Sequence, residues 1–108
     1  MNDQKTKAAQ DVLKERARQQ SQEGYTPEKD DGYGMGQLHL AAQSYLGCCA
    51  WRDRNFMHKT AILQNVPSTW PWPQFSWKPK NQRQDLVRAA ALIIAEIERL
   101  DRKGGHDD

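Results

Sequence analysis

Four prolines, three tryptophans and one phenylalanine fall within the thirteen residues from Pro67 to Pro79. Proline lacks a backbone N–H and fixes φ, so this segment cannot continue a helix and favours extended or polyproline backbone. Large aromatic side chains are costly to leave in water, so at least some of these rings must pack against the rest of the chain. The sequence therefore predicts a strap that wraps around a scaffold formed by the other segments.

Three amphipathic stretches predict that this scaffold is helical. Apolar residues recur at spacings of three and four over residues 3–22, from Met35 to Cys49, and from Asn81 to about residue 103. Between the first two stretches, glycines and Pro27 predict a turn-rich loop over residues 24–34, with Gly24 as a left-handed stop. Residues 51–66 show no dominant period and are assigned a short helix.

The last stretch carries the clearest helix signals. Asn81 is a predicted N-cap, with Gln84 three residues later in a capping-box pattern, and Gly104 ends the helix. One apolar line follows the helix through Leu86, Ala90, Ile93, Ile97 and Leu100. Glu96 lies at the edge of this line, where it is predicted to pair with Arg88 or Arg16 across the bundle.

These elements define the expected fold class. The chain is predicted to be all-α: one domain over residues 1–108, a small bundle of three to four helices with the strap before the last helix, and a flexible tail over residues 103–108. The longest apolar run, residues 89–95, is far shorter than the roughly 20 residues that cross a bilayer. No secretory signal pattern begins the sequence, so we expect a cytoplasmic protein without membrane contact.

Composition excludes several classes of function. The cysteines, Cys48 and Cys49, are adjacent and the three histidines are dispersed, so the pair is expected to be reduced core thiols and no zinc spacing exists. The net charge of +2 argues against a duplex-DNA binder. No nucleophile occurs in a strand-turn-helix context, so no catalytic residue is assigned.

Four sequence pieces resemble a family of small, largely uncharacterised proteins encoded by phages and prophages. They cover nearly the whole chain apart from residues 51–69, and they are Glu15-Arg16-x-Arg18-Gln19, Glu23-Gly24-Tyr25-Thr26-Pro27-Glu28-x-Asp30-Asp31, Gly36-x-Leu38-x-x-Ala41-Ala42-x-x-Tyr45, and Trp77-Lys78-Pro79 with the helix from Arg83 to Arg102. The resemblance implies an accessory protein that acts in the bacterial cytoplasm. The family's acidic loop usually has His at Lys29 and Glu at Gln37, and these departures argue against a metal site in the loop.

Aromatic and basic residues interleave at the end of the strap. The rings of Trp70, Trp72, Phe75 and Trp77 lie close in sequence to four cations, Lys78, Lys80, Arg83 and Arg88. Aromatic faces stack on bases and cations neutralise phosphates, so this composition suits a nucleotide or a single-stranded nucleic acid. In the alternative interpretation, the tryptophans close the open side of the bundle and the cations are solvated.

Two further groups of residues have both a functional and a structural interpretation. Asp30 and Asp31 either converge on a ligand such as Mg²⁺ or form turns and caps. The spacings Glu28-x-x-Asp31 and Glu98-x-x-Asp101 also occur in MazG-like nucleotide pyrophosphohydrolases, which hold Mg²⁺ on helices. Arg16 and Gln19 share one face of the first helix, as a ligand-facing ridge or as a salt-bridged surface.

Three functional hypotheses follow. The first is a non-enzymatic module, without a cofactor or metal, that binds a nucleotide-like small molecule or a host protein. The second is a Mg²⁺-dependent nucleotide pyrophosphohydrolase, and the third is a structural module that self-associates into a homo-oligomer. The candidate ligand-binding residues are Arg16, Gln19, Asp30, Asp31, Trp72, Trp77, Lys78, Arg83 and Arg88.

Overall fold

The computed structural model describes residues 5–24, 26–53, 62 and 65–104. Its elements are α1 (Lys7–Gln22), α2 (Pro27–Asp31), α3 (Gln37–Asp53), the 3₁₀ turn η1 (Gln74–Ser76) and α5 (Gln82–Arg102). No strand occurs within these ranges, and the predicted all-α fold class is confirmed. None of the described helices is both long enough and apolar enough to cross a membrane.

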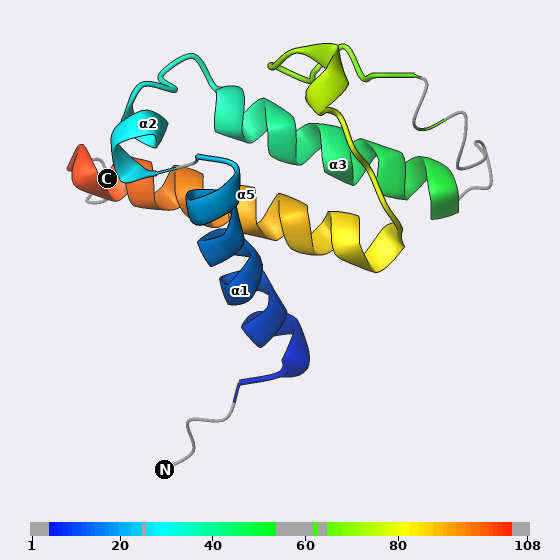
Figure 1. Cartoon of the computed structure of the whole chain (residues 1–108), viewed down its shortest axis with the longest axis horizontal. Coiled ribbons are helices and arrows are strands. Elements are labelled where there is room, and N and C mark those ends of the chain that lie inside the picture. The colour runs from blue at the N-terminus through cyan, green and yellow to red at the C-terminus, as the bar shows by residue number, and fades with distance from the viewer. Residues whose placement is uncertain (1–4, 25, 54–61, 63–64, 105–108) are drawn as a thin grey trace.

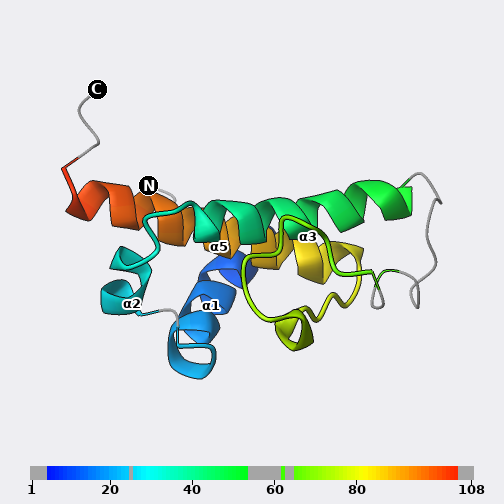
Figure 2. The same ribbon diagram turned by 90° about the horizontal axis from the view of Figure 1, so that it is seen from above.

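Helix α5 is the element against which the other helices pack. α3 lies beside it in the antiparallel direction, α1 crosses it at a steep angle, and α2 contacts it near its C-terminal end (Figure 1). The segment from residue 65 to 81 loops along one side of α3 and returns to the start of α5 (Figure 2). The predicted strap therefore joins the two long antiparallel helices.

Helix α1 begins later than the sequence predicted. Thr6 has extended backbone and its hydroxyl accepts a hydrogen bond from the N–H of Ala9 at 3.1 Å, so it is the N-cap and Lys7 is the first helical residue. The stop at Gly24 is confirmed, because this residue has φ of +77°, a conformation that L side chains rarely adopt. Both signals are local, and a cap hydroxyl fixes a helix start more sharply than apolar spacing does.

The loop predicted over residues 24–34 is interrupted by the five-residue helix α2. Thr26 caps α2 by accepting a hydrogen bond from the N–H of Lys29 at 3.3 Å, and Pro27 occupies the first turn. Proline is excluded from a helix interior but is favoured in the first turn, where its missing N–H would be unpaired in any case. The loop prediction was wrong here because it treated Pro27 only as a helix breaker.

Helix α3 begins two residues later than the predicted start at Met35 and continues beyond Cys49 to Asp53. The first residues of the short helix predicted over 51–66 therefore belong to α3, and residues 54–61, 63 and 64 lie outside the described part of the chain. Five of the six residues predicted for the apolar face of α3 are buried, namely Leu38, Ala41, Ala42, Tyr45 and Cys49, and Cys48 is buried with them. The sixth, Leu46, is 42% exposed.

The aromatic rings of the strap form a cluster over α3. Trp70 and Trp77 are 9% and 4% exposed, their ring centroids are 5.0 Å apart, and both contact the ring of Tyr45. Trp72 packs edge-on against Trp70, and the hydroxyls of Ser44 and Thr69 bond at 2.6 Å. The prediction that some of these rings pack on the helices is confirmed, whereas Phe75 in η1 is 82% exposed.

Helix α5 has the predicted caps but buries a different face. Asn81 accepts a hydrogen bond from the N–H of Gln84 at 2.9 Å, and Gly104 has φ of +77° after the last turn. The core face consists of Ala89, Ala91, Leu92 and Ala95, each at most 1% exposed. The predicted apolar line lies outside this face: Leu86, Ile93, Ile97 and Leu100 are 40% to 51% exposed.

The sequence predicted that Glu96 pairs with an arginine across the bundle, and this prediction was wrong. Its carboxylate accepts two hydrogen bonds from Arg99, one turn further along α5, at 2.9 and 2.8 Å. These bonds hold the pKa of Glu96 below its usual value. The spacing of three residues on one helix brings the two side chains together without any tertiary contact.

We expect Trp77→Ala to lower the free energy of unfolding by about 3–5 kcal/mol, because it leaves a cavity in the aromatic cluster and removes the bond from Trp77 Nε1 to the carbonyl of Ile62. Chemical denaturation measures this loss. Phe75→Ala is the control, and it should change stability by less than about 0.5 kcal/mol because the ring is exposed. Equal losses in the two variants would contradict the packing described above.

Candidate ligand-binding site

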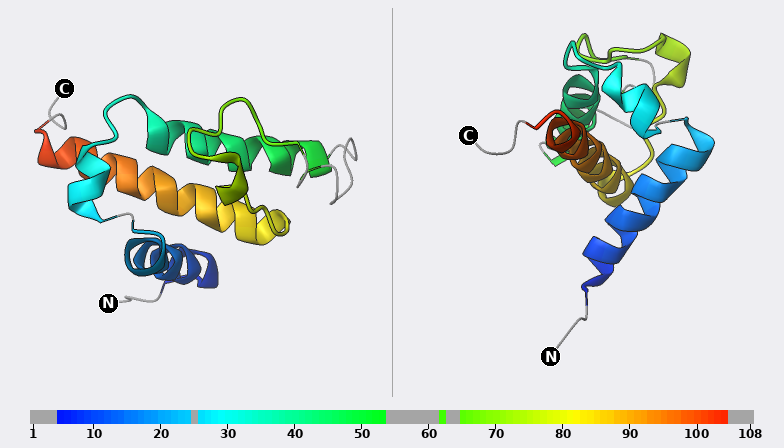
Figure 3. Two further views of the ribbon diagram at one scale, coloured as in Figure 1. Left: turned by 45° about the horizontal axis from the view of Figure 1, so that its top comes forward. Right: turned by 90° about the vertical axis from the view of Figure 1, so that its left-hand side faces the viewer.

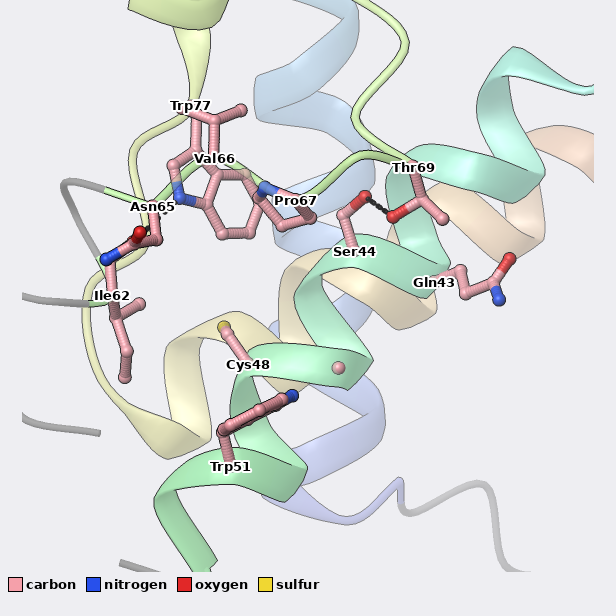
Figure 4. Close-up of a pocket in the computed structure, with 11 residues that line it drawn as sticks. Gln43, Ser44, Cys48, Trp51, Ile62, Asn65, Val66, Pro67, Thr69 and Trp77 are labelled. Carbon is pink, nitrogen blue, oxygen red and sulfur yellow. Dashed lines mark hydrogen bonds between the residues drawn. The ribbon is translucent and has the colours of Figure 1, made fainter. Parts of the chain in front are cut away.

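Two cavities lie on either side of the aromatic cluster. The first, about 390 Å³, lies between α3 and the strap, with Trp77, Val66 and Pro67 on one side and Cys48 and Trp51 on the other (Figure 4). Its lining is mainly apolar, and the hydroxyls of Ser44 and Thr69 within it bond to one another (Figure 4). This cavity could therefore enclose an apolar group, but it has few polar groups that would orient a ligand.

The second cavity, about 320 Å³, lies where α1, α3, the strap and α5 meet. It continues into a wider hollow between α1 and α5, because Glu15, Arg18, Lys80 and Arg88 line both. We call the two together the α1–α5 groove. Six cations and three carboxylates line the groove: Lys14, Arg18, Lys78, Lys80, Arg83 and Arg88, with Asp11, Glu15 and Glu23. Its net charge favours an anionic ligand.

Four of these cations line the inner cavity: Lys78, Lys80, Arg88 and Arg18. The ammonium groups of Lys78 and Lys80 are exposed and form no ion pair with any described residue. Arg88 is held more firmly, since its guanidinium donates to the carbonyl of Lys78 at 2.6 Å and lies 5.8 Å from the ring centroid of Tyr45. These three residues thus give the cavity one fixed cation and two adaptable ones.

Arg18 is neutralised within the protein. It donates two hydrogen bonds to Glu15, at 2.8 and 2.7 Å, and one to Glu23 at 3.1 Å. Burial alone would raise the pKa of Glu15, but the bonds from Arg18 outweigh it and hold that pKa below its usual value. Arg18 therefore forms a wall of the cavity, and it contributes little net charge to a ligand.

Gln19 supplies an unsatisfied polar group. The residue is 3% exposed, and its Nε2 donates to the carboxylate of Glu15 at 3.1 Å and weakly to the carbonyl of Arg88 at 3.5 Å. Both partners are acceptors, which fixes the nitrogen on this side of the amide. Oε1 is left without a hydrogen bond to any described residue, although a buried carbonyl normally has a donor.

Aromatic groups complete the inner cavity. Tyr45 and Trp70 line it from the buried cluster, and Trp70 Nε1 is satisfied by the hydroxyl of Ser76 at 3.0 Å. Phe75 lines the same cavity with a ring that is mostly exposed to solvent. A planar ligand group can therefore contact Phe75 without any rearrangement of the core.

Asp85 holds the basic end of the strap in place. Its buried carboxylate accepts two hydrogen bonds from the backbone N–H of Lys80, at 3.0 and 3.1 Å, and pairs with Arg52 of α3 at 2.8 Å. Arg88 lies 3.4 Å from the same carboxylate. This one side chain therefore joins α3, the strap and α5 and sets the positions of the cations in the groove.

The structure brings four of the candidate residues to the groove. Gln19, Lys78 and Arg88 line the inner cavity, and Arg83 lines the outer hollow. Trp77 lies in the aromatic core and lines the apolar cavity instead, and Trp72 packs between Trp70 and Tyr33, at centroid distances of 5.2 and 5.5 Å. The groove was foreseen in its basic residues and only in part in its aromatic ones.

Arg16, Asp30 and Asp31 lie elsewhere and tie α2 to its neighbours. Arg16 donates to the fully buried carboxylate of Asp30 at 3.0 Å and to Glu98 of α5 at 3.0 Å. Asp31 accepts from Arg102 of α5 at 2.9 and 2.7 Å. Burial raises the pKa of Asp30, and the charge of Arg16 opposes this shift. These ion pairs have a structural role in docking α2 and α1 on α5.

Sequence reasoning missed several residues of the site. Tyr45 was assigned to the core alone, and Glu15 and Arg18 were not weighed, because nothing in one sequence shows that α1 crosses α5 beside the strap. Asp85 was not considered as an anchor for the strap. Its position four residues after Asn81, in the first turn of α5, is the signal that places it next to the backbone N–H of Lys80.

Carboxylates for a magnesium site are not assembled in the described part of the chain. Within it, no three His, Cys, Asp or Glu side chains come together in a way that could hold a metal ion. Asp31 and Glu98, one from each predicted spacing, are already paired with Arg102 and Arg16.

Comparison with known proteins gave no relative: no family model matches the chain, and neither the curated proteins nor the solved structures gave a match. Inferences about function rest on the geometry of the groove.

Removing the charge of Asp85 should destabilise the fold. We expect Asp85→Asn to lower the free energy of unfolding by about 3–5 kcal/mol, because Arg52 is left with an uncompensated, largely buried charge. The matched control is Asp11→Asn, which removes pairs with Lys7 and Arg83 near the surface and should cost much less stability than Asp85→Asn. Chemical denaturation of both variants measures the difference, and a small loss for Asp85→Asn would refute the anchoring role.

The two thiols should be unreactive in the folded protein. Burial, reinforced by the nearby charge of Asp85, raises the pKa of Cys48 to about 12 and raises that of Cys49. The reactive thiolate is therefore scarce until the pH approaches the raised pKa. We expect iodoacetamide to label neither cysteine at pH 8 in the native state and both in guanidinium, as mass spectrometry would show. Rapid native labelling would contradict the burial of the pair.

Proposed function

We propose that the chain is a non-enzymatic binding module whose α1–α5 groove takes a nucleotide-like anion. Lys78, Lys80 and Arg88 are the groups for the phosphates, and Phe75 with the edge of Trp70 is the surface for the base. The single observation that carries the proposal is that the cavity lined by these cations is also lined by Gln19, whose buried Oε1 has no hydrogen bond to any described residue. A ligand with an amino or hydroxyl donor beside its phosphates would satisfy both requirements.

Charge and geometry favour a small ligand over a long nucleic acid. The inner cavity of about 320 Å³ is of the size usual for small-molecule sites, and three carboxylates interrupt the row of cations along the groove. A continuous phosphate backbone would meet Asp11 and Glu15 as well as the basic residues. The groove therefore fits a ligand whose negative charge is confined to one end.

The family resemblance supplies a biological setting for this proposal. Small phage proteins that bind without catalysis act by sequestration, so the ligand would be a nucleotide-like molecule of the bacterial cytoplasm. The groove provides charged and aromatic groups for recognition, and no described carboxylate cluster supports the pyrophosphohydrolase alternative. Binding without turnover is thus the function that the site supports best.

The test is a titration of the full chain, followed by tryptophan fluorescence and melting temperature. The probes are ATP, AMP, adenosine and inorganic tripolyphosphate, which separate recognition of the base from recognition of the phosphates. We expect a nucleotide to bind more tightly than either the nucleoside or tripolyphosphate. The Lys78→Ala/Lys80→Ala variant should weaken nucleotide binding by roughly 100-fold, since each charged contact is worth about tenfold or more.

Matched controls keep this test specific. Lys29→Ala removes an exposed lysine from α2, outside the groove, and should leave binding unchanged. Phe75→Ala should weaken nucleotide binding but not tripolyphosphate binding, whereas Met35→Ala, which truncates a similarly exposed side chain, should affect neither. The proposal fails if no phosphate-bearing probe shifts the melting temperature, or if the double lysine variant binds as tightly as the native chain.

A further inference from the structure

The exposed side of α5 carries an uninterrupted aliphatic stripe. Leu86, Ala90, Ile93, Ile97 and Leu100 follow one another at alternating spacings of four and three, the pattern of a helix that packs against another helix. In the right-hand view of Figure 3, which looks roughly along α5, the near end of α3 lies above α5 and α2 lies to its upper right. The stripe spans about 21 Å at 1.5 Å per residue.

The stripe is exposed although the core side of α5 is buried. Its Leu and Ile members are 40% to 51% exposed, whereas Ala89, Ala91, Leu92 and Ala95 on the core side are at most 1% exposed. Most of the large aliphatic side chains of α5 thus face solvent. A surface of this kind, with regular spacing over four turns, is typical of an interface rather than of a solvated helix face.

The two ends of the stripe complement each other. At its N-terminal end, Leu86 borders a shallow apolar hollow of about 210 Å³, which also involves Ala8 and Val12 of α1 and the side chain of Arg83. At its C-terminal end, Leu100 is an aliphatic side chain with 40% exposure, followed by the exposed Asp101. One end therefore offers a hollow with a cation and the other a side chain with an anion.

We propose that α5 pairs with α5 of a second copy of this chain in a two-fold, antiparallel dimer. Ile93, midway between Leu86 and Leu100, lies at the two-fold axis, and Leu100 of each copy enters the hollow beside Leu86 of the other. Arg83 and Asp101 lie on the same flank of the stripe, because residues 83, 87, 90, 94, 97 and 101 continue the same alternating spacing. The antiparallel arrangement therefore forms two Arg83–Asp101 pairs between the copies.

Sedimentation velocity over a concentration series tests the proposal with the full chain. We expect the native chain to dimerise, and Ile93→Glu to raise the dissociation constant by roughly 100-fold or more, because it places two carboxylates at the centre of an apolar contact. Leu46→Glu is the matched control: Leu46 is an aliphatic residue on α3 with 42% exposure, and the variant should dimerise normally. Circular dichroism and melting temperature establish that both variants fold.

A charge exchange tests the antiparallel direction. Arg83→Asp and Asp101→Arg should each weaken the dimer by roughly tenfold, while the double variant should recover it and a mixture of the two single variants should form a mixed dimer. Asp11→Asn, which removes the partner of Arg83 within one chain, should leave dimerisation unchanged. A chain that stays monomeric at every concentration, or a dimer that Ile93→Glu does not weaken, overturns the proposal. If the double variant with exchanged charges does not recover dimerisation, the antiparallel arrangement is wrong.

Discussion

The buried carboxylate of Asp85 is the interaction on which the rest of this structure depends. It bonds the backbone of the strap through Lys80, the end of α3 through Arg52 and its own helix through Arg88. A buried charge is costly unless several donors surround it, so these donors hold each other in place as much as they hold Asp85. Because Asp85 anchors the strap, the strap closes over the aromatic cluster. The same anchor places the basic groups at the border of the groove.

The architecture could be predicted from the sequence where local rules decide it. The caps at Asn81 and Gly24, the proline-rich strap and the buried face of α3 all follow from neighbouring residues. Two predictions failed because they overlooked local rules. Glu96 was expected to pair with a distant arginine, but Arg99 was nearer on the same helix, and the loop before α3 was expected to be irregular although Thr26 and Pro27 begin a helix.

The candidate site was only partly foreseeable because tertiary contacts assemble it. Four of its cations, Lys78, Lys80, Arg83 and Arg88, are close in sequence and were recognised together. Gln19, with its unpaired Oε1, comes from α1, and its place beside Arg88 depends on how α1 crosses α5. The tryptophans most suited to stacking are needed in the core, and this leaves Phe75 as the accessible ring. In a chain this small, the aromatic residues are needed first to close the core, and only the remaining rings are available to a ligand in the proposed site.

The core shared by α3 and α5 contains four buried alanines, Ala41 and Ala42 on one helix and Ala89 and Ala95 on the other, together with larger residues such as Leu38 and Leu92. Methyl groups have no rotamers to adjust, so a larger side chain at these four positions cannot be accommodated by a change of rotamer at the alanine itself. A single added methylene in this seam would have to displace a whole helix rather than a side chain. Sequence change that leaves the spacing of the two helices unaltered is therefore expected mainly in the strap and at the rim of the groove.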